Sequence, residues 1–237
     1  MSTLLIRLEG PMQSWGDESA FGERRTMREP TKSGIIGLVA SSLGYRRDDE
    51  RLKTLLSLRF GVRIDREGVN VSEYDYQISR VACKNRGHYV SLKYGEYETE
   101  PSQSVLSKRY YLFDASFLCG LEGDERMLKD IAHALCHPMW PLFLGRRSCP
   151  PAKPIYVAIR DGSLEDALRT ESLAQRSELR IRYCIEPIDA DSRAFEQKDL
   201  PLSFDKRKRI YSKRKVIEGY WDYVDSCESE QDPLAIL

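Results

Sequence analysis

One histidine stands in a setting that could support RNA cleavage. His88 lies close in the sequence to Lys84, Tyr89 and Tyr94. RNA can be cut by its own 2′-hydroxyl without a metal, and histidine is the usual proton carrier in such a step. The interpretation that these residues favour is an exposed histidine in a basic hairpin that contacts phosphates. His88 with Lys84 is therefore kept only as an alternative catalytic pair, and no catalytic residue is predicted.

A second group of residues has a spacing that could surround a metal ion. His133, Cys136 and His137 stand at positions i, i+3 and i+4 of an expected helix. No fourth ligand is evident, and His137 directly precedes the helix-ending Pro138. We predict no metal site and no cofactor.

The segment Thr31-Lys32-Ser33-Gly34 precedes an apolar helix and invites comparison with a phosphate-binding loop. Such a loop needs a glycine six residues before the lysine, and position 26 is Thr26. A helix N-terminus can still hold a phosphate through its free N–H groups, aided by Lys32 and Ser33. The alternative is an ordinary capped helix whose glycines allow close packing on a sheet.

The loop GRRSCPP places Arg146 and Arg147 between a glycine and a rigid Pro-Pro pair. Arginine binds phosphates in a bidentate manner, and a stiff loop lowers the entropy cost of ordering. The alternative is a surface turn whose arginines pair with acids. Cys149 is a poor candidate nucleophile, since no histidine or acid lies near it in the sequence.

Basic and aromatic residues are interleaved in two further stretches. One covers residues 80–107, and the other, KRKRIYSKRK at 206–215, has seven basic residues and no acid. Bases of single-stranded nucleic acid stack on aromatic rings while cations hold the phosphates, so the pattern favours a single-stranded partner.

The elements that must position these residues follow from hydrophobic periodicity and capping signals. Residues 12–30 show no period and are expected to form a long polar loop. The order β-α-α-β-β followed by β-α-β predicts an α+β fold of ferredoxin-like type. The expected elements are strands at 3–9, 58–65, 108–120, 155–159 and 179–185, and helices beginning at Thr31 or Ser33, Asp48, Asp124 and Ser163.

Composition limits the function classes. The chain has 237 residues, 41% of them apolar, which suffices for a core in one large domain or two small ones. Lys+Arg and Asp+Glu are 37 each, so polyanion binding must depend on local charge. No apolar run is long enough for a membrane span, and the N-terminus has no signal-peptide pattern, which predicts a cytoplasmic protein. Six scattered cysteines without a CxxC indicate free thiols.

Four segments, in this order and spacing, resemble the CasD family, the fifth-numbered family of CRISPR-associated proteins in its type I-E (Cascade) form. The segments are LIRLEGPMQSWGD at 5–17, EPTKSGIIGLVASSLG at 29–44, KRYYLFDASFLCGLEG at 108–123 and FLGRRSCPP at 143–151. The resemblance extends to LPLSFDKRKRIY near the C-terminus and is weak at 80–107 and after Tyr223.

The resemblance implies a single RAMP-type domain over 1–237 with an RNA-recognition-motif-like ferredoxin fold. A long β-hairpin thumb is expected at about 77–107. The C-terminal part is expected to be reduced, with a basic strand region at about 200–223. The resemblance also implies a non-catalytic subunit that caps the 5′ handle of the crRNA in an antiviral surveillance complex. There it would lie between a CasC-like backbone subunit and a CasA-like large subunit. Target DNA would be contacted only indirectly. The RNA contacts implied are Gln13, Trp15, Arg24, Arg28, Lys32, Ser33, Lys84, Lys108, Arg109, Phe143, Arg146 and Arg147.

A sister branch of the same family, in type I-C systems, processes precursor crRNA at a metal-independent Tyr/Lys/His-type site. GRRSCPP and the thumb sequence look like the type I-E branch, in which a separate enzyme cuts. The alternative function is therefore a metal-independent endoribonuclease that uses His88 and Lys84.

Overall fold

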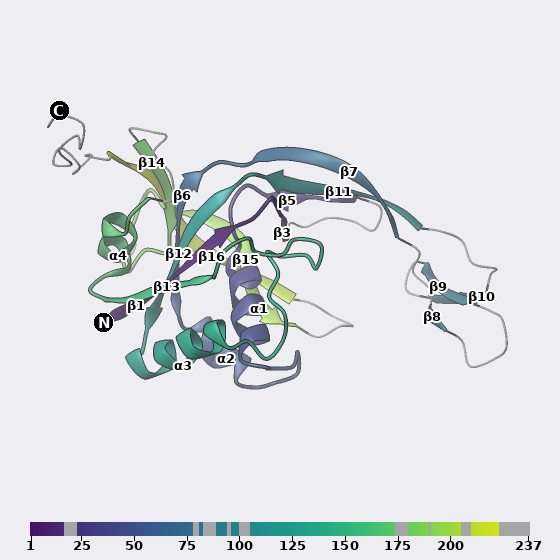
Figure 1. Cartoon of the computed structure of the whole chain (residues 1–237), viewed down its shortest axis with the longest axis horizontal. Helices are drawn as coiled ribbons and strands as arrows, with labels where there is room; N and C mark the ends of the chain where they lie inside the picture. The colour runs from purple at the N-terminus through teal and green to yellow at the C-terminus, as the bar shows by residue number, and fades with distance from the viewer. Residues whose placement is uncertain are drawn as a thin grey trace, which may run out of the picture.

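A seven-stranded antiparallel sheet forms the centre of the computed structural model (Figure 1). The structure describes residues 1–16, 23–77, 81–82, 89–93, 96–99, 105–173, 180–189, 191–204 and 210–222. In spatial order the strands are β13 (Tyr156–Asp161), β1 (Ser2–Glu9), β12 (Ser116–Gly123), β6 (Arg59–Arg66), β14 (Arg180–Ile185), β16 (Ile210–Asp222) and β15 (Phe195–Ser203). Every neighbouring pair in this order is antiparallel.

Apolar side chains on both faces of the sheet explain why its central strands are buried. Along β1, Leu4, Ile6 and Leu8 join the larger hydrophobic cluster, while Leu5 joins a smaller cluster with Leu118. Successive side chains of a strand point to opposite faces, so a nearly continuous apolar run requires cover on both sides.

Helices supply that cover. Helices α1 (Lys32–Ser42), α2 (Leu52–Leu56) and α3 (Glu125–Cys136) contribute to the larger cluster. Helix α4 (Leu164–Thr170) packs on the opposite face through the smaller cluster. The helix starts expected at Thr31 or Ser33, Asp124 and Ser163 are present. Thr31, Asp124 and Ser163 are the N-caps, since each side chain accepts a backbone N–H three residues ahead. The cap expected at Asp48 is wrong: α2 begins at Leu52 without a side-chain cap.

The long strand expected over 108–120 is two strands. Strand β11 (Val105–Phe113) ends before Asp114, which has a φ of 62°, and β12 begins at Ser116 in a different sheet. A residue with left-handed backbone angles cannot continue a strand, so the chain turns at Asp114. The hydrophobic pattern of the sequence gives no sign of this turn.

A long antiparallel ribbon leads away from the central sheet (Figure 1). It pairs β11 with β7 (Val69–Gln77), in a register from Val69–Phe113 to Gln77–Val105. Beyond it, β8 (Val81–Ala82), β9 (Tyr89–Lys93) and β10 (Glu96–Thr99) form a three-stranded sheet.

The stretch 12–30, expected to be a loop, contains short paired segments. They are β2 (Met12–Gln13), β3 (Trp15–Gly16), β4 (Glu23–Arg24) and β5 (Thr26–Met27). Strands β2 and β4 both pair with β11, and β3 pairs with β5, so this stretch connects the base of the ribbon to the core.

The chain is thus a mixed α/β protein dominated by antiparallel sheets. In the part that the structure describes, no helix has the length and apolar character needed to cross a bilayer.

Candidate nucleic-acid interface

Helix α1 is the floor of a pocket, because small residues on one of its faces leave the helix surface open. A side chain at Gly34 would lie 2.8 Å from the Trp15 ring, so this glycine is required for packing. A Cβ at Gly37 would meet nothing within 4 Å. The fold therefore gives no steric reason for a glycine at 37, although glycine weakens a helix interior.

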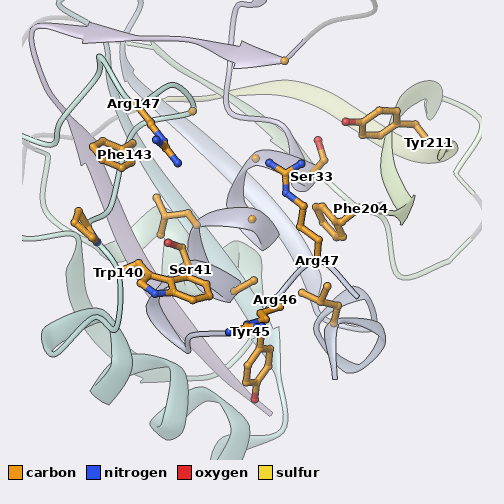
Figure 2. A pocket seen from close by; sticks show the side chains of 18 residues that line it. Ser33, Ser41, Tyr45, Arg46, Arg47, Trp140, Phe143, Arg147, Phe204 and Tyr211 are labelled. Carbon is orange, nitrogen blue, oxygen red and sulfur yellow. The ribbon is translucent and has the colours of Figure 1, made fainter. Parts of the chain in front are cut away.

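The pocket over this helix has a volume of about 820 Å³ (Figure 2). Its walls come from the loop after α1, from the loop after α3 and from the hairpin of β15 and β16. The residues that line it are Gly16, Ser33, Gly34, Gly37, Leu38, Ala40, Ser41, Tyr45, Arg46, Arg47, Leu52, Trp140, Pro141, Phe143, Gly145, Arg147, Phe204 and Tyr211.

The charge of this lining is entirely positive. It contains Arg46, Arg47 and Arg147 and no acidic residue. Within the described ranges, no hydrogen bond or ion pair engages these three guanidinium groups. Unpaired arginines that converge on one cavity create a positive potential suited to an anion such as phosphate.

Two acids near Arg47 in the sequence, Asp49 and Glu50, pair with cations other than the pocket arginines. Arg51 Nη2 donates to Asp49 Oδ2 at 2.7 Å, and Lys53 Nζ lies 3.8 Å from Glu50 Oε1. The hydrogen bonds from Arg51 also hold the pKa of Asp49 below its usual value.

Aromatic rings make up much of the remaining wall. Tyr45, Trp140, Phe143, Phe204 and Tyr211 line the pocket, and Trp140 remains 41% exposed. In Figure 2 the side chain of Arg47 is directed toward Ser33 at the start of α1. Cations beside rings form the kind of site in which a single-stranded nucleic acid binds its phosphates and stacks its bases.

Two of the expected RNA contacts, Gln13 and Trp15, are buried. Both are 0% exposed. Gln13 Nε2 donates to Leu8 O at 3.0 Å and Ala115 O at 2.8 Å, while its Oε1 accepts the Trp15 Nε1–H at 3.2 Å. Gln13 and Trp15 thus hold the loop that follows β1 against the core, and the Trp15 ring packs against α1 at Gly34.

Lys32 likewise directs its side chain to the protein interior, which favours the alternative of an ordinary capped helix. Its side chain is 5% exposed, and its Nζ lies 2.9 Å from Glu186 Oε1. Its backbone N–H donates to Asp199 Oδ2 at 2.8 Å, and Thr31 Oγ1 accepts from Gly34 N–H. Protein carboxylate and hydroxyl groups thus already occupy the helix N-terminus. Ser33, the neighbouring expected contact, does line the pocket.

The adjacent arginines of GRRSCPP have different environments. Arg146 is half-buried, donates to Tyr110 O at 3.2 Å and Arg24 O at 2.9 Å, and lies 4.8 Å from the centre of the Tyr111 ring. Arg147 is exposed and faces the pocket together with Phe143 (Figure 2). Arg146 therefore joins the base of the ribbon to residue 24, and Arg147 is available to a ligand.

The other expected contacts lie beside the ribbon rather than in the pocket. Arg24 is exposed and pairs in register with Arg109, which is buried, while Lys108 Nζ lies 5.4 Å from the Tyr110 ring centre. Arg28 is exposed and does not line the pocket.

A hydrogen bond from Tyr110 to Glu23, at 2.8 Å, lowers the pKa of that carboxyl group and leaves an anion beside these cations. Lys84 and His88 lie outside the described residues.

The thiol in the GRRSCPP loop is not an activated nucleophile. Cys149 is buried, and burial raises the pKa of its thiol. His133 and His137 are exposed, with ring centres 4.8 Å apart. The described ranges contain no cluster of three or more histidine, cysteine or carboxylate side chains placed to hold a metal ion.

Comparison with known proteins identifies the family of the chain that carries this pocket. Residues 3–217 match the family described as CRISPR-associated protein (Cas_Cas5). The chain belongs to the Cas5 family.

Among its relatives is the CRISPR system Cascade subunit CasD of Escherichia coli strain K12, 32% identical over 161 residues, which are 66% of this chain and 70% of CasD. A chain of a solved structure named "CRISPR RNA-guided surveillance complex" is 34% identical with a TM-score of 0.74, over 93% of this chain and 90% of that one. A further structure, "Crystal structure of Cas protein", is 32% identical with a TM-score of 0.69, over 93% of this chain and 95% of the other.

The pocket of this Cas5 chain contains residues that sequence analysis missed. Arg46 and Arg47 directly follow the helix-ending Gly44 and Tyr45, and Trp140 lies in the loop that follows α3, beyond His137 and Pro138. The available signal is a pair of arginines just beyond the end of an expected helix. Tyr211 lies within the basic run at 206–215, which indicates a polyanion contact but not this pocket.

Proposed function

We propose that this chain is a non-catalytic crRNA-binding subunit of a type I-E surveillance complex, in which it caps the 5′ handle of the crRNA. The observation that carries the proposal is the pocket, where Arg46, Arg47 and Arg147 lack protein partners among the described residues and stand beside aromatic rings. CasD is named as a Cascade subunit, and a structurally similar chain comes from an RNA-guided complex, which supports the same assignment.

The chemistry of the pocket suits a splayed single strand. An anionic backbone gains charge-assisted hydrogen bonds from the arginines, and unstacked bases gain stacking on the rings. The open backbone at Gly37 allows a sugar or base to approach the helix closely. Paired bases would hide their faces from the rings, so a duplex fits this site less well than a handle of fixed single-stranded sequence.

We also propose a ferredoxin-like, RNA-recognition-motif-like domain over the whole chain, 1–237. The spatial order β13-β1-β12-β6, with helices between the first and second and between the third and fourth of these strands along the chain, supports it. The ribbon of β7 and β11 would carry the thumb, about 77–107, and β15 with β16 would form the C-terminal region at about 200–223.

The proposed partners are the crRNA, a CasC-like backbone subunit and a CasA-like large subunit, with target DNA reached only through the complex. Among the described residues, the pocket lining has no histidine, lysine or carboxylate to act as general base, which supports a role in holding RNA.

The decisive experiment compares Arg147→Ala with Arg169→Ala in the full chain. Arg169 is an exposed arginine of α4, which packs on the opposite face of the sheet. The probe is a labelled single-stranded RNA that carries the 5′ repeat sequence of the cognate guide. Arg147→Ala should weaken binding about 10- to 100-fold, from about 1.5–3 kcal/mol per charge-assisted contact, and Arg169→Ala should not.

Salt dependence and cleavage complete the test. Loss of one phosphate contact should reduce the slope of log K against log[salt] by about 0.7 for a single strand. Equal affinity of both variants and the wild type would reject the pocket as the RNA site. Specific cleavage of repeat RNA in EDTA that disappears in His88→Ala would replace the scaffold role by the endoribonuclease alternative.

A further inference from the structure

The C-terminal hairpin forms one wall of the pocket, although it comes from the last strands of the sheet. Phe204 follows β15 and Tyr211 lies in β16, and both line the same pocket as Ser33 and Gly37 of α1. A ring contributes to binding only if it stands at stacking distance from a base on the helix floor. Something must therefore fix this edge hairpin relative to α1.

Four charged residues connect the two elements, two of them buried (Lys32 and Asp199) and two half-buried (Glu186 and Arg214). Lys32 Nζ of α1 lies 2.9 Å and 3.0 Å from the two oxygens of Glu186, which follows β14. The Lys32 backbone N–H donates to Asp199 Oδ2 of β15 at 2.8 Å. Arg214 of β16 donates to Asp199 Oδ1 at 2.6 Å and Oδ2 at 2.9 Å, and its Nη1 lies 3.5 Å from Glu186 Oε1.

The geometry of this group suits positioning. The exposed fractions of the four side chains are between 3% and 14%, and the two cations balance the two anions. Glu186 also accepts the Phe60 backbone N–H at 3.0 Å, and the Arg214 guanidinium lies 5.3 Å from the Phe60 ring centre. Apolar packing alone tolerates small slides between elements, whereas directional hydrogen bonds between buried charges favour one arrangement.

We propose that Lys32, Glu186, Asp199 and Arg214 form a positioning lock that holds the wall of Phe204 and Tyr211 at a fixed distance from α1, and that the lock sets RNA affinity through that wall. The inference rests on the proposed function, because it takes the pocket as the RNA site. None of the four touches the RNA. Loss of the lock removes stacking and leaves the contacts of Arg46, Arg47 and Arg147 in place.

A double-mutant cycle in the full chain tests the lock. Tyr211→Ala should weaken binding of the labelled repeat RNA about tenfold, the loss expected for one stacked ring. Arg214→Met should weaken it by a similar factor without changing the salt slope, because no phosphate contact is removed. The double variant should be little weaker than either single variant, since a displaced ring has no stacking left to lose.

Arg63→Met is the matched control for a purely structural effect. Arg63 is 1% exposed, pairs with Asp65 at 2.6 Å and donates to Leu168 O of α4. Its loss should destabilise the fold as Arg214→Met does but leave the affinity of the folded protein unchanged. If Arg214→Met does not fold, Asp199→Asn takes its place, because the amide keeps the shape and one acceptor for the Lys32 N–H.

The outcomes separate this inference from the proposed function. Additive losses in the cycle, or an unchanged affinity of folded Arg214→Met or Asp199→Asn, overturn the lock. If Arg147→Ala still weakens binding in that case, the pocket remains the RNA site. If neither Arg147→Ala nor Tyr211→Ala changes binding, the proposed function itself fails.

Discussion

Replacement of Gly37 by alanine should make the protein more stable and a weaker RNA binder. A Cβ at this position meets no heavy atom within 4 Å, so the methyl group fits without a clash. Alanine is favoured over glycine in a helix interior by about 0.5–1 kcal/mol. For a chain of this size, the melting temperature should rise by about 1–4 °C.

The same methyl group would stand on the floor of the pocket. If a sugar or base contacts the helix backbone there, the methyl displaces it, and overfilling a fitted contact costs about 1–3 kcal/mol. The affinity for the handle RNA should fall by at least about fivefold, with the salt slope unchanged because no cation is removed.

Gly34→Ala is the matched comparison, one turn earlier in the same helix. Its Cβ would lie 2.8 Å from Trp15 Cε3 and 3.1 Å from Thr31 Oγ1. The ring is fully buried and its Nε1–H is bonded to Gln13, so it has little freedom to move. An overpacking cost of about 1–3 kcal/mol exceeds the gain in helix propensity, and the net loss of stability should be about 0.5–2 kcal/mol.

Thermal and denaturant unfolding give the stabilities, and fluorescence anisotropy with the handle RNA gives the affinities. Opposite shifts in melting temperature for the two variants are the expected result. A destabilised Gly37→Ala would contradict the open face of α1. A stabilised Gly37→Ala with wild-type affinity would mean that the RNA does not approach the helix backbone.

Three further changes test other parts of the structure. Asp124→Ala removes the cap that accepts the Met127 N–H at 3.0 Å and should cost about 1 kcal/mol of unfolding free energy, measured by denaturant titration, with RNA affinity retained. Arg146→Ala removes the hydrogen bond from the GRRSCPP loop to Tyr110 O and should lower the melting temperature, whereas Arg147→Ala should not. Equal melting temperatures for the two variants would contradict the different roles of these arginines. Iodoacetamide reacts with thiolates, so Cys149, buried and with its pKa raised, should stay unmodified at mildly alkaline pH while exposed Cys136 is labelled, as peptide mass spectrometry would report.

Local signals in the sequence were sufficient for most elements. The caps at Thr31, Asp124 and Ser163 and the apolar run of β1 act over a few residues, so their patterns can be read directly. The family resemblance could also be identified from the sequence, because it depends on the order and spacing of motifs along the chain. The two-strand character of 105–123 was missed, since one left-handed residue, Asp114, decides it.

The amino-acid sequence alone therefore specifies most of the elements, the family and the kinds of side chain available for RNA. The tertiary structure decided which of them face a ligand. Arg46 and Arg147 stand a hundred residues apart in the chain yet line one pocket, whereas Arg146 turns to backbone carbonyls and Lys32 to Glu186. The direction of a side chain depends on which distant carbonyls and carboxylates compete for it, and that competition exists only once the sheet and its helices have packed together.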